Sequence, residues 1–100
     1  VGFRAGGGEP GWFVEVDRGE NPALNATLDY ADRTIEVART AALEGDASGY
    51  AGTSADGTSV VLTITRERCQ DGMSGEWFEA DAKLQVGERT YNGCGAFLSE

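Results

Sequence analysis

The stretch Ser48–Thr65, SGYAGTSADGTSVVLTIT, decides the fold of this 100-residue chain. Its second half, residues 58–65, places aliphatic side chains at every second position, which is the period of a half-buried β-strand. The four residues before it, Ser54–Gly57, favour a tight turn between antiparallel strands because Asp-Gly suits the backbone of such turns. The stretch therefore predicts a β-hairpin beside which the other strands are arranged.

Alternating runs of the same kind occur on both sides of this hairpin. We expect further strands at residues 1–5, 12–17, 24–30, 34–39, 80–86, 89–92 and 96–98. Glycine and proline punctuate the chain between them, so Gly6–Gly11 is expected to form a loop and Gly87–Glu88 a two-residue turn. Residues 40–45 fit either an extended segment or one helical turn that ends at Gly45, and we favour a strand continuation or a loop.

These runs predict an all-β domain, a small antiparallel meander of about eight strands that closes into a barrel. Consecutive tight turns favour a meander, and closure removes unpaired sheet edges, although an open two-sheet sandwich is the alternative. One hundred residues suit a single domain over residues 1–100. Tyr30 continues the apolar positions of its strand, and Gly93–Gly95 is expected to bend the last one. The expected core is Trp12, Val14, Leu28, Ile35, Val37, Leu62, Ile64, Leu84 and Phe97.

The charge of the chain excludes some classes of partner. Eight basic residues against 17 acidic ones give a net charge of −9. Nucleic acids and anionic membrane surfaces attract basic faces, so neither is an expected partner. No run approaches the roughly 20 apolar residues that span a bilayer. A solvated acidic surface is the simplest interpretation, and a cationic partner or ion is the alternative.

Cys69 and Cys94 are the only two cysteines. Without histidine they cannot complete a four-ligand zinc site, and a disulfide is the favoured interpretation. It would indicate an oxidising compartment outside the cytoplasm and would contribute roughly 3–4 kcal/mol by the chain-entropy estimate. Two buried free thiols in a cytosolic protein are the alternative. The sequence begins at Val1 rather than Met, so a removed leader or a lipid-anchored cysteine upstream is compatible with it.

Catalytic chemistry finds few suitable residues. The chain has no histidine, and Lys83, its only lysine, lies in an alternating run and is expected to face solvent. Glu9 with Asp71 or Glu76 could supply a carboxylate pair, but acids are too common here for the pair to be specific. We therefore expect a protein that is not an enzyme and has no cofactor.

Aspartates in turns raise the possibility of a calcium site. They are Asp29, Asp32, Asp46, Asp56 and Asp71. No D-x-D-x-D-G pattern collects them, and each is explained as a turn residue that bonds its own backbone. We expect no metal site.

Two tryptophans lie beside glycine-containing acidic loops, Trp12 after Glu9–Gly11 and Trp77 after Ser74–Glu76. If both loops lie at one end of the barrel, they would form an aromatic-rimmed mouth for a small ligand or a protein. The alternative is that both indoles fill the core and that the lone methionine fills a gap. The binding-site hypothesis comprises Glu9, Trp12, Asp71, Met73, Ser74, Glu76 and Trp77.

Three motifs carry a resemblance to a known family. Phe3-Arg4-Ala5 followed by Glu9-Pro10-Gly11-Trp12, then Cys69-Gln70-Asp71-Gly72-Met73-Ser74, then Gly93-Cys94-Gly95, resemble small bacterial cell-envelope proteins, often predicted lipoproteins, of uncharacterised role. Such proteins sometimes occur beside the META-type heat-shock lipoprotein domain. The resemblance implies an exported β domain of the periplasm or outer envelope with a Cys69–Cys94 disulfide, and it implies no activity. Glu79 departs from it, because an aromatic-proline pair is expected at Phe78–Glu79.

Two functions follow as expectations. The first is a non-catalytic binding or structural module of the cell envelope. The second is an inhibitor of a cationic enzyme, since Ser74–Trp77 is similar to the Ser-Gly-x-aromatic loop of small barrel inhibitors of C-type lysozyme.

Overall fold

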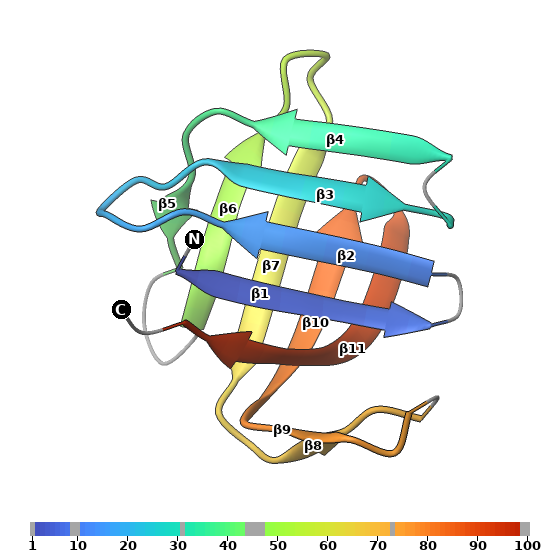
Figure 1. The fold of residues 1–100 in the computed structure, drawn as a ribbon. Helices are drawn as coiled ribbons and strands as arrows, with labels where there is room; N and C mark the ends of the chain where they lie inside the picture. The colour runs from blue at the N-terminus through green and yellow to red at the C-terminus, as the bar shows by residue number, and fades with distance from the viewer. Residues whose placement is uncertain (1, 9–10, 31, 44–47, 73, 99–100) are drawn as a thin grey trace.

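The computed structural model describes residues 2–8, 11–30, 32–43, 48–72 and 74–98 (Figure 1). Within these ranges the chain forms β-strands and no helix. The strands are β1 (Phe3–Gly8), β2 (Gly11–Val16), β3 (Leu24–Leu28), β4 (Arg33–Val37), β5 (Ala41–Ala42), β6 (Ser48–Thr53), β7 (Ser59–Thr65), β8 (Cys69–Gln70), β9 (Trp77–Phe78), β10 (Ala80–Val86) and β11 (Arg89–Phe97). No helix in the described part of the chain is long and apolar enough to cross a membrane.

All of the strand pairs are antiparallel. Nine strands form one sheet in the order β4-β3-β2-β1-β11-β10-β7-β6-β5, and β8 pairs with β9 in a second, two-stranded sheet. This arrangement confirms the predicted all-β antiparallel, barrel-like fold. The described residues contain more strands than the predicted eight or so, and the additional ones include β5, β8 and β9, which have only two residues each.

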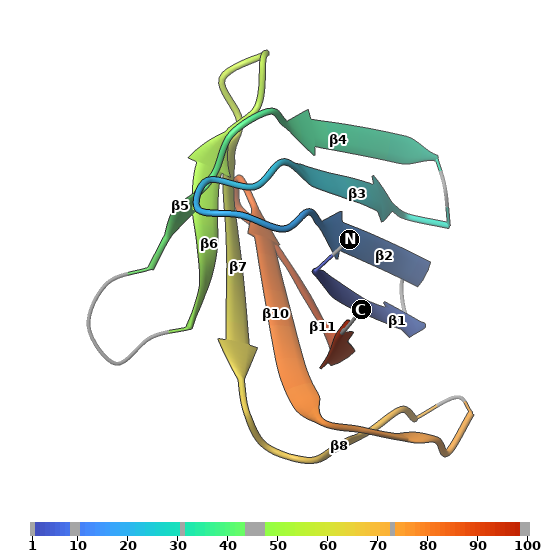
Figure 2. The same cartoon turned by 60° about the vertical axis from the view of Figure 1, so that its left-hand side comes forward.

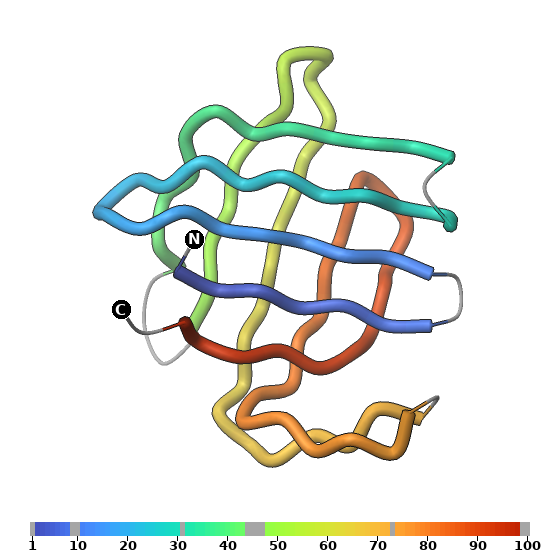
Figure 3. Tube along the Cα trace, viewed as in Figure 1, coloured from blue at the N-terminus to red at the C-terminus, as the bar shows by residue number. Residues whose placement is uncertain are grey.

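The nine-stranded sheet curls on itself so that its two halves face each other. In Figures 1 and 2, β1–β4 form one layer that runs steeply across β6, β7 and β10 in the other. The strand β11 belongs to both layers, since residues 89–95 pair with β10 and residues 94–97 pair with β1. The tube in Figure 3 shows β11 curving between these two partners.

Glycine permits this curvature at the predicted bend, Gly93–Gly95. A Cβ atom on Gly93 would lie only 2.1 Å from the carbonyl oxygen of Gly6. Because real Cβ contacts never come this close, any side chain at position 93 would force β11 away from β1. The close approach of the two strands therefore requires Gly93.

A corner between β4 and β5 joins the two ends of the sheet. Thr40 is buried there, and both its backbone N–H and its hydroxyl donate to the carbonyl of Pro22, at 3.0 and 2.7 Å. The side-chain amide of Asn21 donates to the Thr40 carbonyl at 2.9 Å. Across the corner, a Cβ on Gly52 of β6 would lie 2.6 Å from Val37 Cγ1 of β4. Side-chain packing thus brings the two ends of the sheet together.

The core lies between the two layers of the sheet. Every predicted core residue is buried except Phe97, which is partly buried and packs its ring 5.0 Å from that of Phe3. Further buried residues are Phe3, Ala5, Val16, Leu24, Ala26, Val60, Ala80, Ala82, Val86, Tyr91 and Cys94. Aliphatic and aromatic side chains thus pack the interior between the layers.

Two local predictions are wrong. Residues 6–8 and 11 are not in a loop, because β1 continues through Gly8 and β2 begins at Gly11. Pairing with β2 and β11 overrides the low strand propensity of glycine there. Tyr30 is not inward-facing but 69% exposed, since Asp29 and Tyr30 adopt left-handed φ angles of 52° and 58° that end β3 at Leu28.

Candidate ligand-binding groove

The second sheet belongs to an arm, residues 66–79, that links β7 to β10. Cys69 pairs with Phe78 and Gln70 with Trp77, so Cys69 and Phe78 lie on one face of the arm. Figures 1 and 2 show the arm running below β11 and extending beyond the body of the barrel. A space between the arm and β1 is lined by residues of both.

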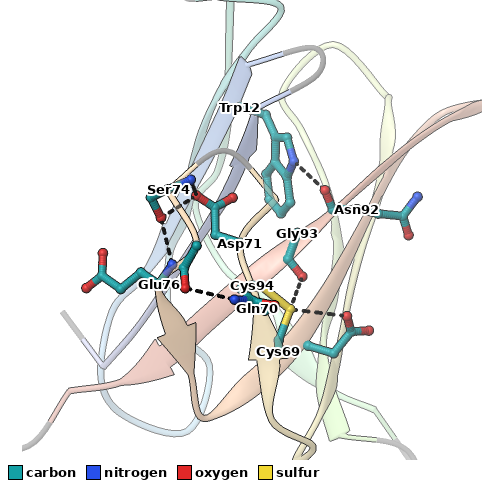
Figure 4. Close-up of a disulfide and its surroundings, with 11 residues drawn as sticks. Trp12, Cys69, Gln70, Asp71, Ser74, Glu76, Asn92, Gly93 and Cys94 are labelled. Atoms are coloured by element: carbon teal, nitrogen blue, oxygen red, sulfur yellow. Dashed lines mark hydrogen bonds between the residues drawn. A yellow bond between two sulfur atoms is a disulfide. The ribbon is translucent and has the colours of Figure 1, made fainter.

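A disulfide between Cys69 and Cys94 fastens the arm to the barrel (Figure 4), as the sequence predicts. Cys94 is 5% exposed in β11, and the two Cα atoms are 5.5 Å apart. The Cys69 sulfur also lies 3.5 Å from the Gly93 carbonyl oxygen and 3.7 Å from a carboxylate oxygen of Asp81. A disulfide sulfur carries no proton to donate, so these approaches are packing contacts that hold the arm against β10 and β11.

The root of the arm has a further attachment at Glu79. Glu79 forms a bend between β9 and β10, and its carboxylate accepts a hydrogen bond of 3.1 Å from the Phe97 backbone N–H. The Arg66 guanidinium lies 3.9 Å from the centre of the Phe97 ring, a cation–π distance. Side chains at both ends of the arm therefore contact the end of β11.

Asp71 organises the turn at the arm's tip. Its carboxylate accepts hydrogen bonds from the backbone N–H and the hydroxyl of Ser74, at 3.0 and 2.8 Å. The Ser74 hydroxyl in turn accepts from the Glu76 N–H at 3.1 Å, and the Gln70 side chain donates to the Gly75 carbonyl at 3.0 Å (Figure 4). These side-chain bonds to nearby backbone groups close the turn, so Asp71 and Ser74 shape the arm.

The first part of the groove is mainly apolar. It has a volume of about 530 Å³ and is lined by Arg4, Ala5, Gly6, Gly7, Gly8, Phe13, Asp71, Phe78, Cys94, Ala96 and Leu98. Phe13 of β2 is 40% exposed, and Phe78 is the aromatic residue that the arm contributes. Arg4 forms an ion pair of 3.0 Å with Glu15, which balances its charge. This part of the groove presents apolar surface to which two phenyl rings contribute.

The second part of the groove is acidic. Its volume is about 450 Å³, and it shares Gly7, Gly8, Asp71 and Cys94 with the apolar part. Its other lining residues are Cys69, Gln70, Gly72, Asp81, Asn92 and Gly93. The charged side chains of this described lining are the two aspartates. The groove as a whole therefore joins an apolar part to an anionic part.

The structure separates the two predicted tryptophans. Trp12 is 5% exposed in the core, where its indole N–H donates to the Asn92 carbonyl at 3.1 Å and its ring lies 6.2 Å from that of Tyr91. Trp77 is 54% exposed on the arm, with the Arg68 guanidinium 4.5 Å from its ring centre. The two indoles do not rim a common mouth.

Of the other predicted site residues, Asp71 lines both parts of the groove, and Ser74 and Glu76 are exposed in the arm's turn. Glu9 and Met73 lie outside the described residues. Sequence reasoning missed Phe13, Phe78 and Asp81. Phe13 gave a usable signal, because it is an aromatic residue on the polar face of its strand.

A second cluster of polar side chains surrounds Asp29. Its carboxylate accepts a hydrogen bond of 3.0 Å from the Tyr91 hydroxyl and pairs with Arg89 at 3.2 Å. Burial of the phenol, together with the hydrogen bond to Asp29, raises the pKa of Tyr91 above its ordinary value of 10.0. The cluster connects the end of β3 to β11, which is a structural role.

The other described aspartates considered for calcium, Asp32, Asp56 and Asp71, belong to no metal-binding group. Hydrogen bonds from Ser54 and Thr58 lower the pKa of Asp56 in the turn between β6 and β7. Asp46 lies outside the described residues. Across the described residues, no three acidic, cysteine or histidine side chains form a metal-binding group.

Comparison of the chain with models of protein families, with curated proteins and with solved structures yields no match.

Proposed function

We propose that this protein is a non-catalytic binding module of the bacterial cell envelope and that the groove between the arm and β1 is its binding site. The observation that carries the proposal is the groove itself, a space of about 530 Å³ beside a barrel whose interior is packed with side chains. Ligand sites in proteins typically occupy about 300–1,000 Å³ and combine apolar walls with a few polar groups. The groove has both properties.

The absence of histidine from the sequence supports a role without catalysis. Of the two aspartates that line the groove, Asp71 has a structural role, because its carboxylate shapes the arm's turn. Binding needs no further chemistry from them.

The disulfide supports a location outside the cytoplasm. Disulfides persist in oxidising compartments and are rare where thiol reductants act. The resemblance of the Cys69–Ser74 motif to envelope proteins agrees with this compartment. An envelope protein whose arm is held by a disulfide would keep its groove intact there.

A fragment-binding experiment tests the groove. In ¹H–¹⁵N spectra, a library of small organic fragments should shift the amides of Gly6, Gly7 and Gly8 more than those of other strands. Ala96→Trp should abolish these shifts, because Ala96 lines the groove and an indole there would fill it. Thr63→Trp, at a partly exposed position of β7 that lines neither part, is the matched control and should preserve them.

Shifts scattered over the surface, or hits that persist in Ala96→Trp, would contradict the proposed site.

The exposed tip of the arm favours inhibition of a cationic enzyme as a second candidate function. Ser74, Glu76 and Trp77 are all exposed, and Trp77 retains 54% of its surface. A negatively charged loop with an aromatic residue suits a basic enzyme through electrostatic steering. C-type lysozyme activity should fall in the presence of the protein, and Trp77→Ala should relieve the inhibition. Unchanged activity at micromolar excess of the protein would eliminate this candidate.

A further inference from the structure

The groove joins an apolar part to an acidic part, and this combination indicates the chemical class of its ligand. We infer that the groove takes an extended segment of a basic partner protein, in which an apolar side chain lies next to a lysine or arginine. This inference rests on the proposed function and adds the chemical class of the partner to it. Three features of the groove carry it.

The first feature is the pair of phenyl rings. Phe13 on β2 and Phe78 on the arm both line the apolar part, with Ala96 and Leu98 of the chain's end beside them. Phe13 leaves 40% of its surface exposed. An aliphatic side chain that entered this part would remove apolar surface of both the groove and the ligand from water.

The second feature is the position of the carboxylates. Asp71 lines both parts, and Asp81 lines the acidic part next to Cys69 and Gly93. The cation of the groove, Arg4, lies in the apolar part and is paired with Glu15 at 3.0 Å. A lysine or arginine placed beside the apolar side chain would therefore meet the negative charge of Asp81.

The third feature is the floor of the groove. Gly6, Gly7 and Gly8 of β1 line it, and Gly7 and Gly8 are common to both parts, so the apolar and acidic parts are continuous along this strand. The net charge of −9 also favours encounter with a basic protein over a neutral one. These properties favour a peptide segment over a compact small molecule.

Three six-residue peptides with blocked ends test the inference. The first alternates leucine and lysine, the second replaces lysine by glutamate, and the third replaces leucine by serine. Titration into ¹⁵N-labelled protein should shift the amides of Gly6–Gly8 with the leucine–lysine peptide at an affinity at least tenfold above that of either control. Equal affinity for the glutamate or the serine peptide would overturn the inference, as would an absence of binding by all three.

Charge variants locate the cation. Asp81→Asn should lower the affinity for the leucine–lysine peptide about three- to tenfold. The variant should still bind this peptide more tightly than the peptide in which serine replaces leucine. Glu88→Gln is the matched control, because it removes one negative charge at a residue that lines neither part, and it should leave the affinity unchanged. Equal effects of the two variants would show that only the net charge attracts the peptide, and would overturn the placement of its cation beside Asp81.

A failure of the inference is distinguishable from a failure of the proposed function. If fragments bind the groove and Ala96→Trp blocks them while the leucine–lysine peptide does not bind, the groove is a binding site for a ligand of another class. If the peptide binds without shifting Gly6–Gly8, both the proposed site and the inference are wrong. If small alkylamines bind as tightly as the peptide, the inference is wrong, and the ligand of the groove is a small amphipathic cation and not a protein segment.

Discussion

Asp29 forms a hydrogen bond with Tyr91, which lies 62 positions away in the sequence. Its backbone lies in the left-handed region, with a φ of 52°, which turns the chain at the end of β3. This turn leaves the carboxylate 3.0 Å from the Tyr91 hydroxyl and 3.2 Å from the Arg89 guanidinium. Tyr91 is only 2% exposed, so its hydroxyl depends on Asp29 for a partner. A single turn residue therefore satisfies a buried group of β11.

The first prediction concerns Tyr91 and alkaline pH. Because its pKa is raised in the folded state, the unfolded chain loses the phenolic proton first as pH rises. The stability associated with this shift is complete below about pH 10, and it is lost as pH rises from there through the raised pKa. Tyr91→Phe should lower the free energy of unfolding by about 1 kcal/mol near neutrality, through the lost hydrogen bond.

Urea unfolding of both proteins between pH 7 and pH 11 measures this effect. The difference in stability should shrink above pH 10, where the wild type alone loses stability through the Tyr91 proton. A difference that stays constant over the whole range would show that Tyr91 has the same pKa in both states.

At the scale of the element, β11 determines how the sheet curls. It is the longest strand, and Cys94 and Gly95 pair with both β1 and β10. The bend is possible because Gly93 lets β11 approach the backbone of Gly6. The strand thereby joins the layer β1–β4 to the layer that contains β10.

The second prediction concerns this bend. Gly93→Ala should destabilise the protein by roughly 1–3 kcal/mol, since its Cβ would collide with the Gly6 carbonyl and force the strands apart. Gly72→Ala is the matched control: among the described residues, apart from its chain neighbours, no atom lies within 4 Å of the added Cβ, so it should change stability by less than about 0.5 kcal/mol. Thermal unfolding of both variants provides the comparison. Equal stability of the two would contradict the close contact.

Period-two patterns predicted most strands well, and β10 has the predicted bounds, residues 80–86. The glycine-rich end of β1 was wrongly predicted as a loop, because its partners β2 and β11 are known only from the fold. The end of β3 was misplaced because Tyr30 continues the apolar pattern while its backbone turns. Local sequence contains neither the long-range pairing nor the turn conformation that decided these positions.

The groove was harder to predict than the fold. The hypothesis included Asp71 because unusual residues cluster in the motif after Cys69, and the structure places Asp71 in both parts of the groove. It omitted Phe13 and Phe78, which line the same part of the groove only because the fold brings the arm beside the barrel. It also grouped Trp12 with Trp77, although strand alternation alone is compatible with Trp12 in the core, where it lies.

At the scale of the whole molecule, the protein is a barrel-like sheet with an arm fastened beside it. The arm contributes Phe78 and Asp71 to the groove, and the barrel contributes β1, β11 and Phe13. Besides the backbone at its two ends, the Cys69–Cys94 disulfide cross-links the arm to the barrel. The core residues of the barrel lie outside the arm, so the barrel should fold without this link.

The third prediction concerns the disulfide. Replacing Cys69 and Cys94 together by alanine should lower the free energy of unfolding by roughly 3–4 kcal/mol, the chain-entropy value for a loop of 25 residues. Hydrogen exchange should show lost protection in the arm, residues 66–79, while β7 and β10 remain protected. Uniform loss of protection over the whole chain would contradict an independently folded barrel.

The central claim is that the arm and the barrel together make the binding site. The most direct measurement compares fragment binding to the wild type and to the Cys69→Ala/Cys94→Ala protein, followed through the amides of Gly6, Gly7 and Gly8. Fragments should shift these amides in the wild type and lose at least tenfold in affinity in the variant, because the released arm no longer forms a wall of the groove. Equal affinity for both proteins would show that the arm forms no part of the site and would contradict the account.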